Sequence, residues 1–161
     1  MSALPSVLST LVRSCKTALP VALLALAAGS AGNAHAIDFQ SLAEAAILYD
    51  SPSLQGQRMF ILRPGTPVEI IVSDPNWVKV REPGGSLNWV ERRTLSATRT
   101  LLVSVPRASI RQAPRDDAPL SFEAVQNVVL QLAAAPELGW VKVRHADGAE
   151  GYLRVSEAWG L

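Results

Sequence analysis

The chain has 161 residues and a formal net charge of +1, from 15 basic and 14 acidic residues. Arg13 and Lys16 precede the first acidic residue, Asp38, so the chain from residue 37 onward has 13 basic against 14 acidic residues, a net charge near −1. A near-neutral chain has no electrostatic footprint for nucleic acid or an anionic membrane surface, and we expect neither as a partner.

The first 36 residues have the pattern of a secretory signal peptide. Arg13 and Lys16 form a positive segment, an apolar run follows over residues 18–28, and Ala34-His35-Ala36 has the small-x-small form of a cleavage site. An N-terminal membrane helix is the alternative, but the apolar run is shorter than the ~20 residues that span a bilayer. We therefore predict cleavage after Ala36 and a periplasmic or secreted protein with no integral membrane segment.

The single cysteine, Cys15, lies before the apolar run, where a lipid-anchored cysteine would have to follow it. We therefore expect no lipid anchor. After cleavage the chain has no thiol and only one histidine, His145, so it must rely on its apolar core for stability.

Short strand-like runs separated by turn signals follow the signal peptide. Residues 37–46 are a lead-in with room for a short helical turn, and residues 91–100 form a polar junction. Between them the β-branched and apolar runs, bounded by Pro, Gly, Ser and Asn, predict strands over residues 47–50, 59–62, 68–72, 77–81 and 87–90.

The second half repeats this order. Its predicted strands cover residues 101–105, 108–111, 125–132, 140–144 and 151–155. The terminal segment, residues 156–161, contains Trp159, which we expect to pack as a cap. The junction is short and has neither Gly nor Pro, so we expect the two halves to be held close together.

One five-residue string occurs in both halves. Trp77-Val78-Lys79-Val80-Arg81 returns 63 positions later as Trp140-Val141-Lys142-Val143-Arg144, and each copy runs into a glycine turn. A long internal period indicates one structural unit used twice, with boundaries that we place at residues 37–97 and 98–161. Because side chains alternate across a strand, the valines should form each core while the tryptophans and cations lie on the opposite face.

These motifs resemble the bacterial SH3-like (SH3b) domain, a small five-stranded barrel. Each string is followed by a glycine turn and an aromatic-aliphatic pair, Trp89-Val90 or Tyr152-Leu153, as in the late half of that family. The segment Ala108–Pro114 resembles its early half, whereas Ala46–Pro52 lacks the arginine found there. The resemblance implies an all-β protein of two tandem SH3-like β-barrels, and a binding module for peptidoglycan or a protein partner.

Five aromatic side chains are the candidate ligand-binding residues: Trp77, Tyr49, Trp89, Trp140 and Tyr152. A Trp offers a large rigid surface with a polar N–H, which favours recognition. The competing interpretation is that the two string tryptophans cover one end of each barrel, since small domains need their aromatic residues for packing. If both units have a groove, we expect the first to be the more aromatic.

Lys79, Arg81, Arg92 and Arg93 form a basic group that could meet an acidic ligand such as the carboxylates of peptide stems. Their alternative role is an ordinary solvated face, because Glu82 and Glu91 dilute the charge.

We expect no metal, no cofactor and no catalysis. His145 has too few His or Cys companions for a metal site, no Gly-x-Ser-x-Gly motif is present, and Asp116-Asp117 is a loop pair. The predicted function is that of an exported, non-catalytic module that binds peptidoglycan or an envelope protein. A structural or assembly protein that packs on an envelope partner is the alternative.

Overall fold

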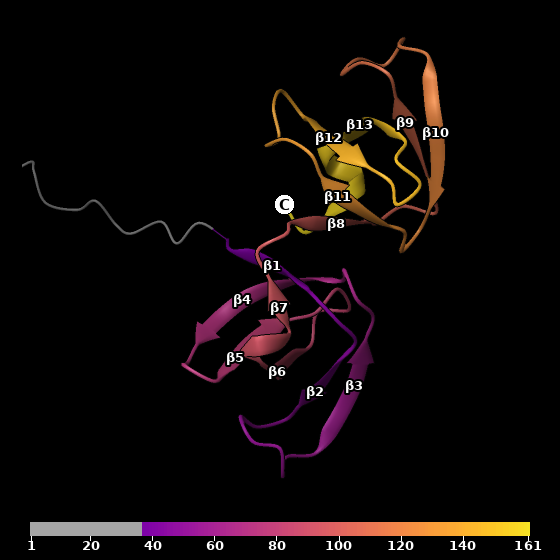
Figure 1. Cartoon of the computed structure of the whole chain (residues 1–161). Helices are drawn as coiled ribbons and strands as arrows, with labels where there is room; N and C mark the ends of the chain where they lie inside the picture. The colour runs from indigo at the N-terminus through magenta and orange to yellow at the C-terminus, as the bar shows by residue number, and fades with distance from the viewer. Residues whose placement is uncertain (1–36) are drawn as a thin grey trace, which may run out of the picture. The chain divides into compact units, whose positions relative to one another are not determined.

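The computed structural model describes residues 37–161, which form β-strands and two short 3-10 helices joined by turns and loops. The first half contains seven strands: β1 (Phe39–Leu42), β2 (Ala46–Tyr49), β3 (Arg58–Leu62), β4 (Pro67–Ser73), β5 (Trp77–Arg81), β6 (Leu87–Glu91) and β7 (Leu95–Ser96). The 3-10 helix η1 (Arg92–Thr94) lies between β6 and β7. These strands form barrel one (Figure 1).

The second half has the same element order. Its strands are β8 (Thr100–Val103), β9 (Arg107–Arg111), β10 (Leu120–Val125), β11 (Val129–Leu132), β12 (Trp140–Arg144), β13 (Glu150–Arg154) and β14 (Ala158–Trp159), with η2 (Val155–Glu157) before the last. These strands form barrel two (Figure 1).

Both sheets are antiparallel and have identical topology. Barrel one has the strand order β3-β2-β6-β5-β4-β1-β7, and barrel two has β10-β9-β13-β12-β11-β8-β14. Each strand of the first sheet therefore has a counterpart seven strands later in the second. The prediction of an all-β chain made of one unit used twice is confirmed.

Each barrel has its own apolar core, to which the repeated string contributes two valines. Val78 and Val80 lie in the core of barrel one, Val141 and Val143 in that of barrel two, and all four are almost wholly buried. At about 25 cal/mol for each Å² of apolar surface removed from water, buried aliphatic side chains are the main stabilising contribution to small barrels of this kind. The prediction that the valines form the cores is confirmed.

Three predictions for local structure are wrong. The lead-in forms strand β1 rather than a helical turn, because its residues hydrogen-bond as an extra strand beside β4. Residues 125–132 do not form one strand, because a turn at Asn127, whose φ is 67°, separates β10 from β11. The polar junction belongs largely to barrel one, since it contains η1 and β7.

Thr100, the first residue of β8, hydrogen-bonds to residues of barrel one. Its hydroxyl is 2.6 Å from the Ser41 hydroxyl and donates to the Gly65 carbonyl at 2.6 Å, and both Ser41 and Thr100 are buried. Trp159 packs edge-on against Phe39, with 5.1 Å between the ring centroids. The described residues, 37–161, all belong to one compact unit.

Candidate functional site

A groove of about 590 Å³ lies beside Trp77 in barrel one. Its walls are two loops, 50–57 between β2 and β3 and 74–76 between β4 and β5, together with the start of η1. The side chains that line it are Pro52, Ser53, Leu54, Gln55, Pro75, Asn76, Trp77, Glu91, Arg92 and Arg93. It combines one aromatic ring, two prolines and two arginines.

Trp77 is half-buried because it occupies the outer face of β5, opposite the core valines. Tyr49 supports it from β2: the two rings meet edge to face, with centroids 5.5 Å apart and planes at 90°. Tyr49 is only 5% exposed and does not line the groove. Such edge-to-face packing fixes the orientation of the indole that lines the groove.

Trp89 lies on β6 directly opposite Tyr49 and Lys79 in the sheet register. The Lys79 ammonium sits 5.9 Å from the centre of its ring, and Trp89 is not among the residues that line the groove. Of the three aromatic candidates in the first unit, only Trp77 therefore faces the groove.

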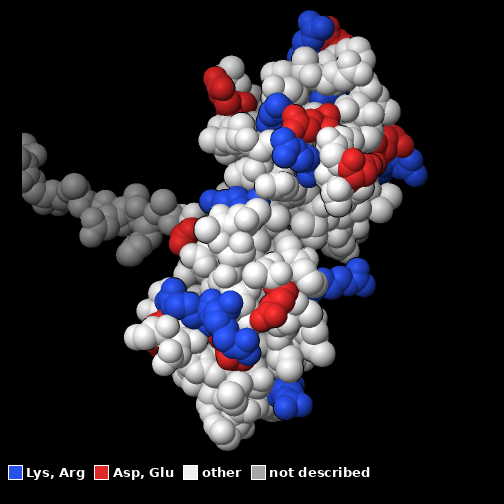
Figure 2. Space-filling view, viewed as in Figure 1, with Lys and Arg blue, Asp and Glu red and all other residues white. Residues whose placement is uncertain are grey.

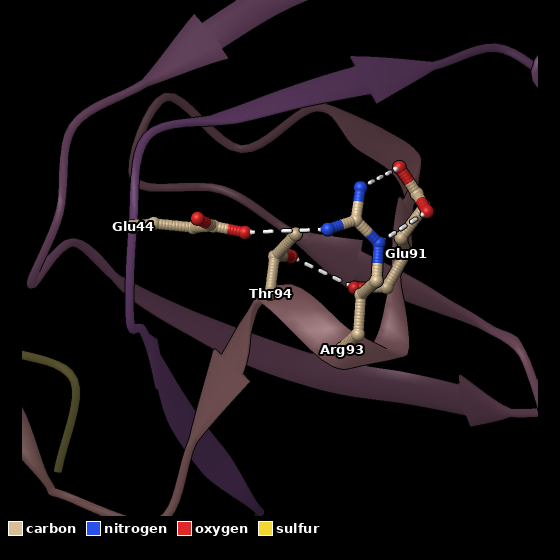
Figure 3. Close-up of polar contacts among 4 residues, drawn as sticks. All are labelled: Glu44, Glu91, Arg93 and Thr94. Carbon is tan, nitrogen blue, oxygen red and sulfur yellow. Dashed lines mark hydrogen bonds and ion pairs between the residues drawn. The ribbon is translucent and has the colours of Figure 1, made fainter.

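An ion-pair network forms the edge of the groove at η1 (Figure 3). The Arg93 guanidinium donates to both carboxylate oxygens of Glu91, at 2.8 and 3.1 Å, and a further guanidinium nitrogen is 3.6 Å from Glu44. Hydrogen bonding to Glu91 and its charge raise the pKa of Arg93 above its usual value. The Thr94 hydroxyl donates to the Glu91 carbonyl at 2.7 Å, which stabilises the turn.

The loop 74–76 is held against η1 through Arg92. The Arg92 backbone N–H donates to the Asn76 carbonyl at 2.9 Å, and its side-chain Nε–H donates to the Asp74 carbonyl at 2.8 Å. This short loop and the first turn of η1 therefore form one wall. Sequence reasoning named Arg92 as a candidate but missed Leu54 and Asn76, although the prolines within both loops marked them as turns.

Barrel two has a smaller pocket of about 280 Å³ at the corresponding place. It is lined by Pro114, Ala134, Ala135, Glu137, Leu138, Trp140, Lys142 and Tyr152. The loop before β12 spans residues 133–139, seven residues against three in barrel one, and provides one wall. Two aromatic candidates, Trp140 and Tyr152, line this pocket, whereas only Trp77 lines the groove of barrel one. The sequence had led us to expect the first unit to be the more aromatic.

Trp140 is more covered than Trp77. It is 8% exposed, and the Arg154 guanidinium stacks 4.9 Å from the centre of its ring. Arg154 also forms an ion pair with Asp116. In the register of barrel one the residue opposite Trp77 is Glu91, so a cation covers one tryptophan and a carboxylate lies opposite the other.

Charged side chains of both signs lie interspersed on the face shown in Figure 2.

Within residues 37–161, no group of His, Cys, Asp and Glu is arranged to hold a metal ion. Asp147 is held as a carboxylate in a turn, where the Ala149 N–H and then His145 lower its pKa. No helix in the described part of the chain is long and apolar enough to cross a membrane.

Solved structures that match this chain include two proteins from Trichomonas vaginalis, NlpC2 and NlpC1, and an NlpC/P60 family protein from Bacillus cereus. Sequence identities to this chain are 18%, 17% and 16%, and each TM-score is 0.35. The matches cover 77%, 76% and 76% of this chain and 48%, 45% and 56% of those structures, so the chain spans about half their length. No curated protein matches the chain.

The bacterial SH3 domain model matches this chain twice, over residues 43–97 and 104–160. Domains of this family are commonly found in extracellular proteins and often serve as binding modules. Each match covers six of the seven strands of one copy and begins directly after its first strand, β1 or β8. The chain therefore belongs to the bacterial SH3 domain family and contains the domain in two tandem copies.

Proposed function

We propose that this chain is an exported, non-catalytic binding module that recognises peptidoglycan through the groove of barrel one. The observation that carries the proposal is the half-buried Trp77, held edge to face by Tyr49, which lines a groove of about 590 Å³. In this account residues 1–36 are the signal peptide, cleaved after Ala36, and residues 37–97 and 98–161 are the two domains.

The groove has the features of a recognition site rather than of a packing defect. An indole with a fixed orientation offers a large contact area at a low cost in conformational entropy. Pro52 and Pro75 stiffen the two loops that face it, so little order has to be created on binding. Gln55, Asn76 and Arg92 in the lining supply polar groups for a ligand with peptide and hydroxyl groups.

Retention on purified sacculi tests this proposal. Wild-type protein should sediment with the sacculi, and Trp77→Ala should reduce the bound fraction about tenfold or more, as expected for a central aromatic anchor. Phe60→Ala is the matched control, because Phe60 is an exposed aromatic residue on β3 that does not line the groove. Equal retention of wild type and Trp77→Ala, or no retention of either, contradicts the proposal.

Assembly with another envelope protein is the second candidate function, and strand β3 favours it. β3 is an edge strand of its sheet, and Met59, Phe60 and Ile61 on it are exposed, Ile61 by 73%. An edge strand with exposed apolar side chains is a template for pairing with another chain. Cross-linking in envelope extracts should then capture one stoichiometric partner, and Phe60→Ala, not Trp77→Ala, should abolish its capture.

A further inference from the structure

Four basic side chains of barrel one were candidates for binding an acidic ligand, and the structure distinguishes them by their partners. Arg81 is paired with Glu69 at 2.6 Å, on strands β5 and β4. Lys79 lies over the Trp89 ring, outside the lining of the groove. Neither side chain is placed to meet a ligand in the groove.

Arg93 lines the groove but is already engaged by two carboxylates. It makes a two-point contact with Glu91 and a longer one with Glu44 (Figure 3). A second acidic group that approached Arg93 would meet both of these negative charges. The two-point geometry is the arrangement that an incoming carboxylate would need, and Glu91 occupies it.

Arg92 is the remaining cation. It lines the groove beside Trp77, and its Nε–H donates to the Asp74 carbonyl. Among residues 37–161, no carboxylate lies within ion-pair distance of Arg92. The hydrogen bond to Asp74 fixes the direction of the guanidinium while both of its Nη groups keep their donors, so the cation is oriented before a ligand arrives.

We propose that Arg92 is the anion subsite of the groove and that its ligand is a short peptide ending in a free carboxylate, the peptide stem of peptidoglycan. The terminal carboxylate accepts hydrogen bonds from the Nη groups of Arg92, and the preceding apolar side chain packs on Trp77 and Leu54. This inference rests on the proposed function and adds to it the chemical group that selects the ligand.

Barrel two cannot supply the same subsite. The residue that corresponds to Arg92 at the start of η2 is Val155. The nearby cation, Arg154, is stacked on Trp140 and paired with Asp116. Lys142, the basic residue that lines that pocket, is 3.0 Å from Glu150. Selection for a carboxylate is therefore a property of barrel one.

Calorimetric titration with a matched pair of ligands tests the inference. The probes are the linear peptide stem released from peptidoglycan, with its terminal carboxylate free, and the same peptide as its C-terminal amide. Wild-type full-length protein should bind the acid about tenfold more tightly than the amide, the difference expected when a charge-assisted hydrogen bond is lost. Arg92→Gln should bind both peptides with the weaker affinity.

Two further variants separate a binding role of Arg92 from its structural one. Arg92→Lys retains the charge and should keep part of the preference for the acid. If the role of Arg92 were purely structural, Arg92→Lys and Arg92→Gln would lose this preference equally. Arg93→Gln should keep the preference for the acid. If this variant loses the preference, the subsite belongs to Arg93 and the inference is overturned. Equal binding of acid and amide by wild type overturns the inference but leaves the proposed function standing. Binding of neither peptide, together with no retention on sacculi, overturns both.

Discussion

The groove of barrel one and the pocket of barrel two are built on corresponding strands that contain the same five-residue string, yet their surfaces differ. In barrel one the loop before β5 has three residues and Trp77 faces a groove of about 590 Å³. In barrel two the loop before β12 has seven residues, and Trp140 lies under Arg154 beside a pocket of about 280 Å³. The string thus specifies a common core, whereas loop length and the residue opposite the tryptophan determine the surface.

The two tryptophans should differ most in their contribution to stability. Trp140→Ala removes a buried ring and its contact with the Arg154 guanidinium, and should lower the free energy of unfolding by about 3 kcal/mol. Trp77→Ala removes a half-buried ring and should lower it by about half as much. Urea denaturation followed by circular dichroism measures both values. Equal losses would mean that Trp77 is as much a packing residue as Trp140.

The corresponding positions Asn88 and Gly151 offer a second comparison of the barrels. They lie opposite Val80 and Val143 in the register of their sheets. A Cβ at Gly151 would lie 2.5 Å from Ile110 Cγ2 and 2.7 Å from the Arg111 carbonyl oxygen, whereas the same place in barrel one holds a buried asparagine.

Gly151→Ala should therefore destabilise the protein by about 2 kcal/mol, the usual cost of overpacking a core. Asn88→Ala is the matched control and introduces no clash. Thermal unfolding of the two variants checks this, and an unchanged midpoint for Gly151→Ala would show that barrel two can relax at this position.

The long loop of barrel two contains a strained residue. Leu138 and Gly139 both have positive φ, 49° and 82°, between Glu137 and Trp140, whose backbones exchange two hydrogen bonds of 2.8 and 2.9 Å. These φ values are those of a type I′ turn, whose central positions favour Asn and Gly. Leu138 is 92% exposed, so it gains almost no burial in return.

Leu138→Asn should consequently stabilise the protein by up to about 1 kcal/mol, since it relieves a left-handed backbone conformation that is costly for leucine. The reverse change, Asn127→Leu at φ 67°, should destabilise it by a similar amount. Denaturant midpoints test both, and a loss of stability in Leu138→Asn would show that the leucine makes a contact that offsets the strain.

The smallest expected effect is a pH dependence of the free energy of unfolding, and its source is a carboxyl group in barrel two. Glu150 lies 3.0 Å from Lys142 and accepts a hydrogen bond of 2.7 Å from Arg144, and these cations hold its pKa below the usual range. A carboxyl with a lowered pKa stabilises the folded state above its unfolded pKa, and this contribution is lost as the pH falls through its folded pKa.

The stability difference between wild type and Glu150→Gln should accordingly be present at neutral pH and shrink on acidification. Denaturation at a series of pH values measures it. A difference that stays constant at every pH would show that the ion pairs around Glu150 do not carry the effect.

The fold could be predicted from the sequence to a large extent, because the repeated string has a strand period and recurs at a fixed spacing. Strands β5 and β12 match their predicted bounds, and the four valines lie in the cores. Strand β1 could not be recognised, since its identity as a strand comes from pairing with β4 and β7 and not from its own composition.

The candidate site was less accessible to sequence reasoning. Composition gave no means of distinguishing Arg92 from Arg93, because the difference lies in which of the two meets Glu91 and Glu44. Alternation along the strand correctly placed Trp77 on the outer face. Only the folded chain reveals that Tyr49 packs edge to face against Trp77 and that the Lys79 ammonium lies over the Trp89 ring. Contacts across loops depend on tertiary structure that no local pattern encodes.

Barrel one, not barrel two, is the ligand-binding unit in our proposal, and the indole N–H signals of the tryptophans distinguish the two barrels. The signals can be assigned by single Trp→Phe substitutions and followed by NMR as the peptide stem with a free carboxylate is added. We expect the Trp77 signal to shift in a saturable manner while the Trp140 signal stays in place. A shift of Trp140 alone, or of neither signal at concentrations at which the protein is retained on sacculi, would contradict it.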